Sequence, residues 1–182
     1  MTAVPGAGGF REQVLLAGWE IECCVPPPVV GAVVEWGLEF VPALDPPDPL
    51  LDRELVWSVQ AGPGDVAQLV RGPVVAAWSD APAPPGPVRL TGQLVASEHG
   101  GSALEDLPPC RGRVERIRLL RQEYRETEPR SWMPVPGTVS AVEVAESPRR
   151  FDETDPEPAG PWSIGVLVDL LVDPRLPAPA DG

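Results

Sequence analysis

The stretch Val-Val-Glu-Trp-Gly-Leu-Glu-Phe, at residues 33–40, decides the fold. Successive side chains of a β-strand point to opposite faces, so alternation with a period of two predicts a strand with one buried face. The residues expected on the buried face are Val34, Trp36, Leu38 and Phe40. The sequence therefore predicts a strand here that covers a hydrophobic core.

Other runs with the same period lie on both sides of this stretch. They are residues 14–23, 55–59, 88–96, 139–144 and 163–172. In the first of these runs, the residues expected to share the buried face are Leu15, Ala17, Trp19, Ile21 and Cys23. Strands of this length, separated by turns rich in glycine and proline, are typical of an antiparallel β fold.

The run at residues 113–126 has a divided pattern. Val114, Ile117, Leu120 and Tyr124 would share one face of a helix. The glycine before the run and the β-rich surroundings favour a strand instead. We predict a strand here and keep a helix over the same residues as the alternative.

Proline and glycine are unusually frequent, with 26 and 18 residues in a chain of 182. The prolines gather between the alternating runs, where they end strands and form connections. We therefore predict an all-β fold, either a small antiparallel barrel or a two-sheet sandwich, with about seven short strands and long proline-rich loops. We expect one domain over residues 10–173, with a flexible N-terminus at 1–9 and a flexible tail at 174–182.

The charge of the chain excludes several classes of partner. The formal net charge is −13, which repels nucleic acid and anionic membranes, so we expect neither as a partner.

The chain has no lysine and a single histidine, which excludes a P-loop, Schiff-base chemistry and any site with several histidines. No targeting segment or apolar span is visible, and three cysteines suit a reducing compartment, so we expect a cytoplasmic protein without a cofactor.

One segment departs from the acidic average. Residues 111–130 contain seven arginines and four glutamates, and we call this segment the Arg-rich strip. It could dock an acidic protein partner, with Arg116, Arg118 and Arg121 as the candidate contacts. Alternatively, it could be a solvated face whose arginines pair with acidic groups of the same chain.

Tryptophans at positions 19 and 36 are the other candidate binding residues. Trp19 and Trp36 both lie in runs with a period of two, on the expected apolar face. Anchoring of the core is the simplest role for such residues, because an indole buries a large apolar area. An aromatic groove that stacks on a ligand is the alternative.

The cysteines allow a metal site or a thiol site. Cys23 and Cys24 are adjacent, and on a strand they would point to opposite faces, so that Cys23 would pack in the core. A vicinal disulfide would strain the peptide between them. A zinc site could draw on Cys23 or Cys24 together with Cys110 and His99, but the spacing matches no zinc-knuckle pattern. A redox-active thiol is the remaining interpretation of this pair.

His99 is the only imidazole in the chain, and it follows a predicted strand and precedes two glycines. A histidine can act as a general base when a carboxylate orients it. The carboxylates closest in sequence are Glu98, Glu105 and Asp106. The sequence thus allows an enzyme built on His99, although a solvent-exposed or capping histidine is the simpler interpretation.

Several motifs in the chain resemble a family of small actinobacterial proteins of unknown function. The pattern is Trp-x-x-Glu-Cys-Cys at residues 19–24, followed by Val-Gly-x-x-Val-x-Trp at residues 30–36. Further similar segments are residues 99–101, 112–124, 134–137 and 165–170. The resemblance spans most of residues 13–172 and implies no activity, cofactor or partner.

Taken alone, the sequence favours a non-enzymatic binding or interaction module, because no complete catalytic set can be read from it. The alternatives are a metal or thiol site formed by Cys23, Cys24, Cys110 and His99, and an enzyme that uses His99 with a carboxylate.

Overall fold

The computed structural model describes residues 9–62, 66–79, 84–99, 102–151, 160–177 and 179, and it confirms an all-β fold. The strands are β1 (Phe10–Ala17), β2 (Val33–Trp36), β3 (Leu38–Pro42), β4 (Arg53–Ala61), β5 (Ala67–Arg71), β6 (Val74–Trp78), β7 (Gly86–Ala96), β8 (Cys110–Glu128), β9 (Ser131–Pro134), β10 (Ser140–Val144) and β11 (Pro161–Val172). The helices are α1 (Gly18–Cys23) and α2 (Ser102–Glu105).

The described residues thus form eleven strands, where about seven were predicted. Much of the flexible N-terminus predicted at 1–9 lies outside the described residues, as do parts of the predicted tail and loops. Neither α1 nor α2 has the length and apolar character that a membrane-spanning helix requires.

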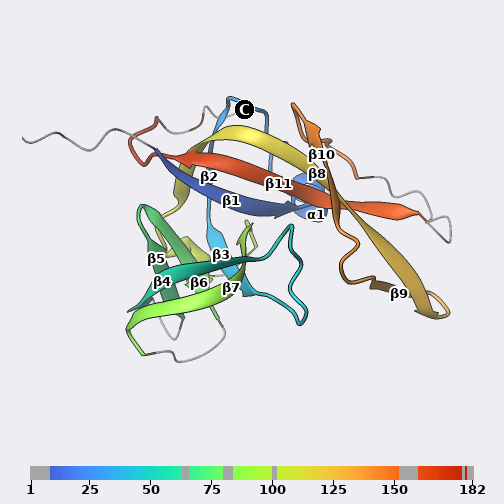
Figure 1. Cartoon of the computed structure of the whole chain (residues 1–182). Helices are drawn as coiled ribbons and strands as arrows, with labels where there is room; N and C mark the ends of the chain where they lie inside the picture. The colour runs from blue at the N-terminus through green and yellow to red at the C-terminus, as the bar shows by residue number, and fades with distance from the viewer. Residues whose placement is uncertain are drawn as a thin grey trace, which may run out of the picture.

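Five strands close into a barrel in the order β3, β6, β5, β4, β7 and back to β3. All neighbours in this ring are antiparallel except β3 and β6, which run parallel. Figure 1 shows these strands as the lower half of the molecule. Of the two predicted architectures, a barrel and a sandwich, the barrel is therefore the one observed.

A second layer of strands extends from β7 and arches over the barrel (Figure 1). β1 pairs parallel with β7, with Val14 opposite Leu94, and antiparallel with β11 along its whole length. β11 in turn pairs with β8, which also carries β2, β9 and β10 as further neighbours. The strand β8 is thus the strand on which this layer is assembled, since it pairs with four others. Its far end, together with β9, projects away from the barrel.

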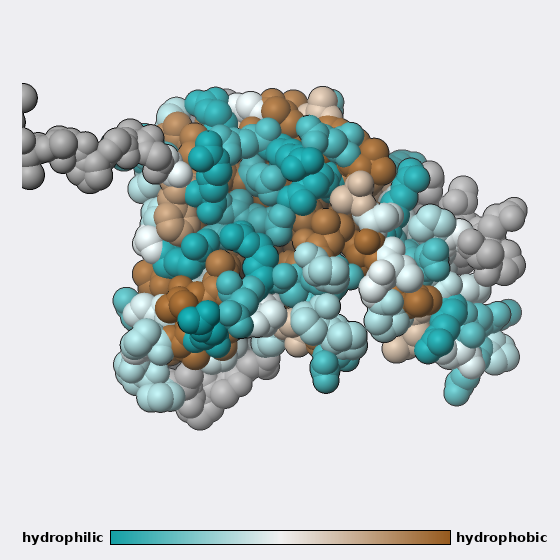
Figure 2. Space-filling view, viewed as in Figure 1, coloured by the Kyte–Doolittle hydropathy of each residue, from teal (hydrophilic) through white to brown (hydrophobic). Residues whose placement is uncertain are grey.

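One hydrophobic core joins the barrel to the second layer. Its largest fully buried members include Trp57 of β4, Leu38 of β3, Leu16 of β1 and Ile117 of β8. Burying a side chain of this size stabilises the fold by about 1.5–3 kcal/mol. In the view of Figure 2, the hydrophobic residues that reach the surface form separate groups with hydrophilic residues between them.

The N-terminal run differs from the prediction of one strand over residues 14–23. Strand β1 ends at Ala17, and the buried face carries Val14 and Leu16 rather than Leu15 and Ala17. The chain then turns into helix α1, and its first residue, Gly18, lies under the ring of Phe151, where a Cβ would collide. The prediction of a strand over residues 18–23 was wrong because a helix of six residues is too short to show a helical period in the sequence.

The stretch at residues 33–40 forms two strands rather than one. Its predicted inward side chains are confirmed for Trp36, Leu38 and Phe40, which are all buried. At Gly37 the chain leaves β8, the partner of β2, and joins β7, the partner of β3. The alternation persists through this change of partner because both halves face the same core.

The prediction of a strand at residues 113–126 is confirmed by β8, and the helix alternative is wrong. The spacing of three residues between Val114 and Ile117 arises from a β-bulge, since Glu115 has no partner in the register with β11. Leu120 is also buried, but it lies outside the core cluster that contains Val114 and Ile117. The β-bulge at Glu115 and the burial of Leu120 therefore give the apolar residues of this strand a spacing like that of a helix.

The strand β8 continues past the core to a small aromatic cluster. Tyr124 of β8 stacks on Trp162 of β11 at 4.3 Å between ring centroids, and Trp132 of β9 lies 5.6 Å from Trp162. Burial raises the pKa of the Tyr124 hydroxyl. These rings fasten the projecting end of β8 and β9 to the end of β11.

The close approach of β1 to β11 predicts a strong effect at Gly165. This glycine lies at an irregularity of β11, with φ of 156°, and an added Cβ would overlap the carbonyl oxygen of Leu16. Gly165→Ala should lower the free energy of unfolding by about 1–3 kcal/mol or more in chemical denaturation. The matched control is Gly137→Ala, which also has a positive φ, of 72°, but meets no atom within 4 Å. Equal losses for the two variants would contradict the close approach at Gly165.

Candidate functional site

A cluster of chemically reactive side chains forms where β1 and β7 end. The two strands run parallel, with Leu16 opposite Ala96, so their carboxyl ends meet at the same edge of the sheet. Helix α1 follows β1 directly, and the segment Ser97–His99 follows β7. The parallel pairing therefore brings together two segments that are about 75 residues apart in the chain.

Helix α1 places its polar and reactive residues on two sides. Glu20 and Ile21 point inward and are buried, whereas Trp19 is 57% exposed and Cys23 and Cys24 lie at the surface. The helix ends at Cys23, where the amides of Cys24 and Val25 both donate to the Glu20 carbonyl oxygen at 2.8 Å. Three prolines follow Val25, and they cannot continue the helix.

The carboxylate of Glu20 is the buried centre of the site. Glu20 is 1% exposed, and a buried carboxylate is stable only when hydrogen-bond donors surround it. The hydroxyl of Ser97 donates to Oε1 at 2.6 Å, and the amide of Glu98 lies 3.4 Å from Oε2. The segment after β7 thus supplies the partners of a charge that comes from α1.

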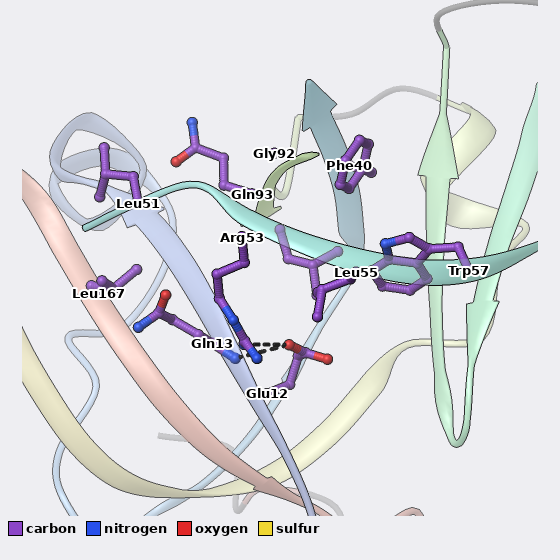
Figure 3. Close-up of a pocket in the computed structure, with 11 residues that line it drawn as sticks. Glu12, Gln13, Phe40, Leu51, Arg53, Leu55, Trp57, Gly92, Gln93 and Leu167 are labelled. Atoms are coloured by element: carbon purple, nitrogen blue, oxygen red, sulfur yellow. Dashed lines mark hydrogen bonds and ion pairs between the residues drawn. The ribbon is translucent and has the colours of Figure 1, made fainter. Parts of the chain in front are cut away.

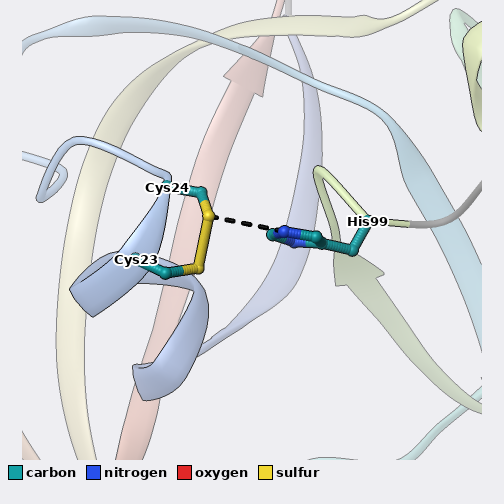
Figure 4. Close-up of side chains that lie close together, drawn as sticks. All are labelled: Cys23, Cys24 and His99. Carbon is teal, nitrogen blue, oxygen red and sulfur yellow. Dashed lines mark hydrogen bonds between the residues drawn. A yellow bond between two sulfur atoms is a disulfide. The ribbon is translucent and has the colours of Figure 1, made fainter.

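His99 contacts both this carboxylate and the exposed sulfur atoms. Its Nδ1 lies 3.1 Å from Glu20 Oε2, and its Nε2 lies 3.4 Å from Cys24 Sγ (Figure 4). Because a carboxylate only accepts hydrogen bonds, the Nδ1–H form is favoured, and Nε2 is left as the acceptor that faces the sulfur. The imidazole is half exposed and lies 5.3 Å from the Trp19 ring, so one side of it remains open.

Cys23 and Cys24 form a vicinal disulfide at the end of α1 (Figure 4). This corrects two expectations, since Cys23 is exposed rather than packed in the core, and the two sulfurs lie together rather than on opposite faces. The error came from treating residues 18–23 as a strand. In a helical segment that ends at these residues, adjacent side chains can point to the same side of the surface.

The partner of His99 was also missed by the sequence interpretation. The carboxylates considered were Glu98, Glu105 and Asp106, but the one that contacts the imidazole is Glu20. One signal was present: Glu20 and Cys24 are four residues apart, which places them close together on a helix. That signal has meaning only once the helix at residues 18–23 is recognised.

Cys110 does not join the cluster. The ligand atoms of Cys23, Cys24 and His99 all lie within 4.8 Å of one another, and this group does not include Cys110. Cys110 instead opens β8 opposite Trp36, and it is 1% exposed. Burial, followed by the negative charge of Glu12, raises the pKa of its thiol to about 12. The structure therefore separates one of the four predicted metal-site residues from the other three.

The Arg-rich strip lies on β8, and two of its three candidate contacts have acidic neighbours. Arg116 pairs with Glu143 of β10 at 2.7 Å, and Arg118 pairs with Asp169 of β11 at 2.6 Å. Arg121 is exposed beside β10. These ion pairs are those expected of a solvated face that pairs with acidic groups of the same chain.

Trp36, the second tryptophan named as a candidate binding residue, is buried. It is 5% exposed and belongs to the hydrophobic core. Only Trp19 of the two is positioned to touch a ligand, and it lies beside the cysteine–histidine cluster.

A small cavity between the barrel strands and strands β1 and β11 of the second layer is lined by a buried charge. Its volume is about 10 Å³, close to the space of one water molecule, and Figure 3 shows Glu12 and Arg53 pointing toward one another across it. Glu12 has no exposed side-chain surface, and it pairs with Arg53 at 3.0 Å and with Arg71. This charge is already neutralised and leaves little space, so the cavity is structural.

The exposed cluster can therefore perform sulfur chemistry. It contains a disulfide at the surface, an imidazole that can accept or donate a proton at Cys24, and a buried carboxylate that orients the imidazole. This order of groups, sulfur then imidazole then carboxylate, is the arrangement that activates a thiol in proteins.

Comparison with known proteins adds a family to this description. No curated protein and no solved structure matches the chain. A family of unknown function, DUF6578, matches residues 10–172, which contain every strand of the described residues and the whole cysteine–histidine cluster. The chain therefore belongs to the family of unknown function DUF6578.

Proposed function

We propose that the protein is a thiol–disulfide redox protein in which Cys23 and Cys24 form the redox couple. The observation that carries this proposal is the position of His99, with Nε2 at 3.4 Å from Cys24 Sγ and Nδ1 at 3.1 Å from the buried Glu20 carboxylate. A proton acceptor held beside one sulfur of an exposed disulfide favours thiol exchange, because the attacking species is a thiolate.

This disulfide is expected to contribute little to the stability of the fold. A disulfide stabilises a fold mainly by closing a loop of the unfolded chain, and the effect grows with the length of that loop. Cys23 and Cys24 are one residue apart, so their bond closes no loop of the fold and links no two elements. Its position at the surface next to an imidazole fits a chemical role instead.

The exchange balances with two equivalents of a small or protein thiol, RSH. His99 Nε2 takes the proton of RSH, and the thiolate attacks Cys23 Sγ. The disulfide bond breaks, and Cys24 leaves as a thiolate that takes the proton from the imidazolium. A second RSH attacks the outer sulfur of the mixed disulfide and releases RSSR, while Cys23 leaves and is protonated. The protein disulfide is reduced by two electrons, and two RSH are oxidised to RSSR.

The surroundings of the pair support this assignment of roles. Cys24 Sγ faces the imidazole, whereas Cys23 Sγ lies 3.7 Å from the backbone carbonyl oxygen of Glu20. Stabilisation of a leaving thiolate is therefore available at Cys24 and not at Cys23. In the reducing compartment expected from the sequence, an exposed disulfide is of the transient, exchangeable kind.

The binding role expected from the sequence is supported less directly. Docking of an acidic partner on the Arg-rich strip would have to displace the Arg116–Glu143 and Arg118–Asp169 pairs. The role of Arg121 and its neighbours in binding stays a prediction.

The redox proposal predicts a slower exchange when the imidazole or its carboxylate is changed. His99→Ala and Glu20→Gln should each slow reduction of the disulfide by a small thiol about ten- to a hundredfold, because the proton transfer at Cys24 is lost or misaligned. The rate is measured by stopping the reaction with an alkylating reagent and counting labelled cysteines by mass. The control is Glu105→Gln, which also removes an exposed negative charge but lies outside the cysteine–histidine cluster. Unchanged rates in His99→Ala would sink the proposal.

The burial of Cys110 predicts how many thiols react in the reduced native protein. A thiol with a pKa of about 12 is almost wholly protonated at pH 8, and this one is also inaccessible. We expect an alkylating reagent to label Cys23 and Cys24 rapidly and Cys110 only after unfolding. Rapid labelling of three cysteines in the native protein would contradict this placement of Cys110.

The absence of a closed loop predicts that the disulfide contributes little stability. The double variant Cys23→Ser, Cys24→Ser should change the free energy of unfolding by less than about 0.5 kcal/mol, as other surface substitutions do. Cys110→Ser makes the same chemical change in the core and should cost about 1–3 kcal/mol, since the hydroxyl would lack a partner. A loss above this range in the double variant would show that the pair is structural.

A further inference from the structure

We propose that the dithiol form of this site binds one divalent cation of the thiophilic kind, such as Zn²⁺, through Cys23 Sγ, Cys24 Sγ and His99 Nε2. This inference shares one condition with the proposed function, namely that the Cys23–Cys24 bond can be reduced in the folded protein. It does not depend on whether the site exchanges with other thiols.

Two of the three donor atoms, Cys24 Sγ and His99 Nε2, lie 3.4 Å apart, close to the separation that such a cation needs, and the third is beside them. All three are within 4.8 Å of one another. Bond lengths of about 2.3 Å for Zn–S and about 2.0 Å for Zn–N place the ligands of a tetrahedral site roughly 3.5–4 Å apart. When the disulfide is reduced, the two sulfurs must move apart from bonding distance to this separation of roughly 3.5–4 Å. Both side chains are exposed, so rotation about their χ1 angles can provide that movement.

The surroundings of His99 supply a second, independent argument. A histidine that binds a metal with one ring nitrogen commonly donates its other N–H to a carboxylate, which fixes the orientation of the ring. Glu20 Oε2 occupies this position at 3.1 Å from Nδ1, and Ser97 holds the same carboxylate at 2.6 Å. The free nitrogen, Nε2, is therefore directed at the sulfurs by a group that is buried and cannot easily move.

The ligand set also determines the class of cation and leaves one position open. Two thiolates and one imidazole favour Zn²⁺ and similar soft ions over Mg²⁺ or Ca²⁺, which prefer oxygen ligands. The cysteines and the imidazole are exposed, so a fourth, solvent-facing position is open to water or to a ligand atom from another molecule. A tetrahedral site with three protein ligands and an open position is the kind found at reactive rather than structural zinc centres.

The redox state would control this site. Zinc needs thiolates, and a disulfide sulfur carries no thiolate charge, so the oxidised pair cannot bind the cation in this way. Reduction by two RSH, with formation of RSSR, creates the two thiols, and binding of the cation then releases their protons. A bound cation would in turn block oxidation of the pair. The site would therefore hold the cation under reducing conditions and release it on oxidation.

The test uses the full chain without a histidine tag, in the disulfide and dithiol forms, under anaerobic conditions. Labelling with an alkylating reagent first establishes that two thiols are free in the dithiol form. Each form is then titrated with Co²⁺ alone, whose charge-transfer bands report thiolate ligands, and with Zn²⁺ alone in competition with a chromophoric chelator. We expect one equivalent to bind to the dithiol form with sulfur charge-transfer bands, and no binding to the disulfide form.

Variants identify the ligands and separate the two proposals. His99→Ala should weaken Zn²⁺ binding at least tenfold, and Glu20→Gln about ten- to a hundredfold. Glu105→Gln, at an exposed carboxylate outside the ligand cluster, should bind as the unaltered protein does. A dithiol form that has two free thiols but binds no stoichiometric Co²⁺ or Zn²⁺ overturns the metal site and leaves the redox proposal standing. Equal affinity of His99→Ala and the unaltered protein overturns the three-ligand site. A disulfide that cannot be reduced in the folded protein overturns both proposals.

Discussion

The buried carboxylate of Glu20 is the interaction on which the site depends. A charge that is 1% exposed must be surrounded by donors, and these come from Ser97, Glu98 and His99, which follow β7. The helix that carries Glu20 cannot shift without removing those donors. The same contacts fix the imidazole, so a constraint imposed by desolvation also determines the direction of Nε2 toward the sulfurs.

The sheet explains why these segments meet at all. β1 and β7 are parallel neighbours, and parallel strands end at the same edge, so whatever follows each strand is brought together there. The barrel closes through β7 on one side, and β1 extends it into the second layer on the other. The cluster therefore lies at the junction of the two layers, where Ile21 of α1 packs into the hydrophobic core.

Much of the fold could be predicted from the sequence, whereas the site could be predicted only in part. Alternation with a period of two marks strands wherever one face is buried, and it located the stretches that became β3, β7 and β11. It failed at residues 18–23, where a six-residue helix is shorter than two turns and leaves no period to read. Cys23, Cys24 and His99 could be singled out as unusual residue types, but their pairing with Glu20 depends on the contact of β1 with β7, which no local pattern encodes.

The two cysteines are alike in sequence, and the fold makes them different. One sulfur faces an imidazole and the other faces a backbone carbonyl oxygen, so the disulfide has a preferred leaving group before any other thiol arrives. In the proposed metal site, the same imidazole nitrogen and both sulfurs of the reduced pair become the donors that a single cation shares. The two proposals thus assign one set of atoms to two different chemistries, one for each oxidation state. Glu20 serves both, because in each case its role is to hold Nδ1 and leave Nε2 free.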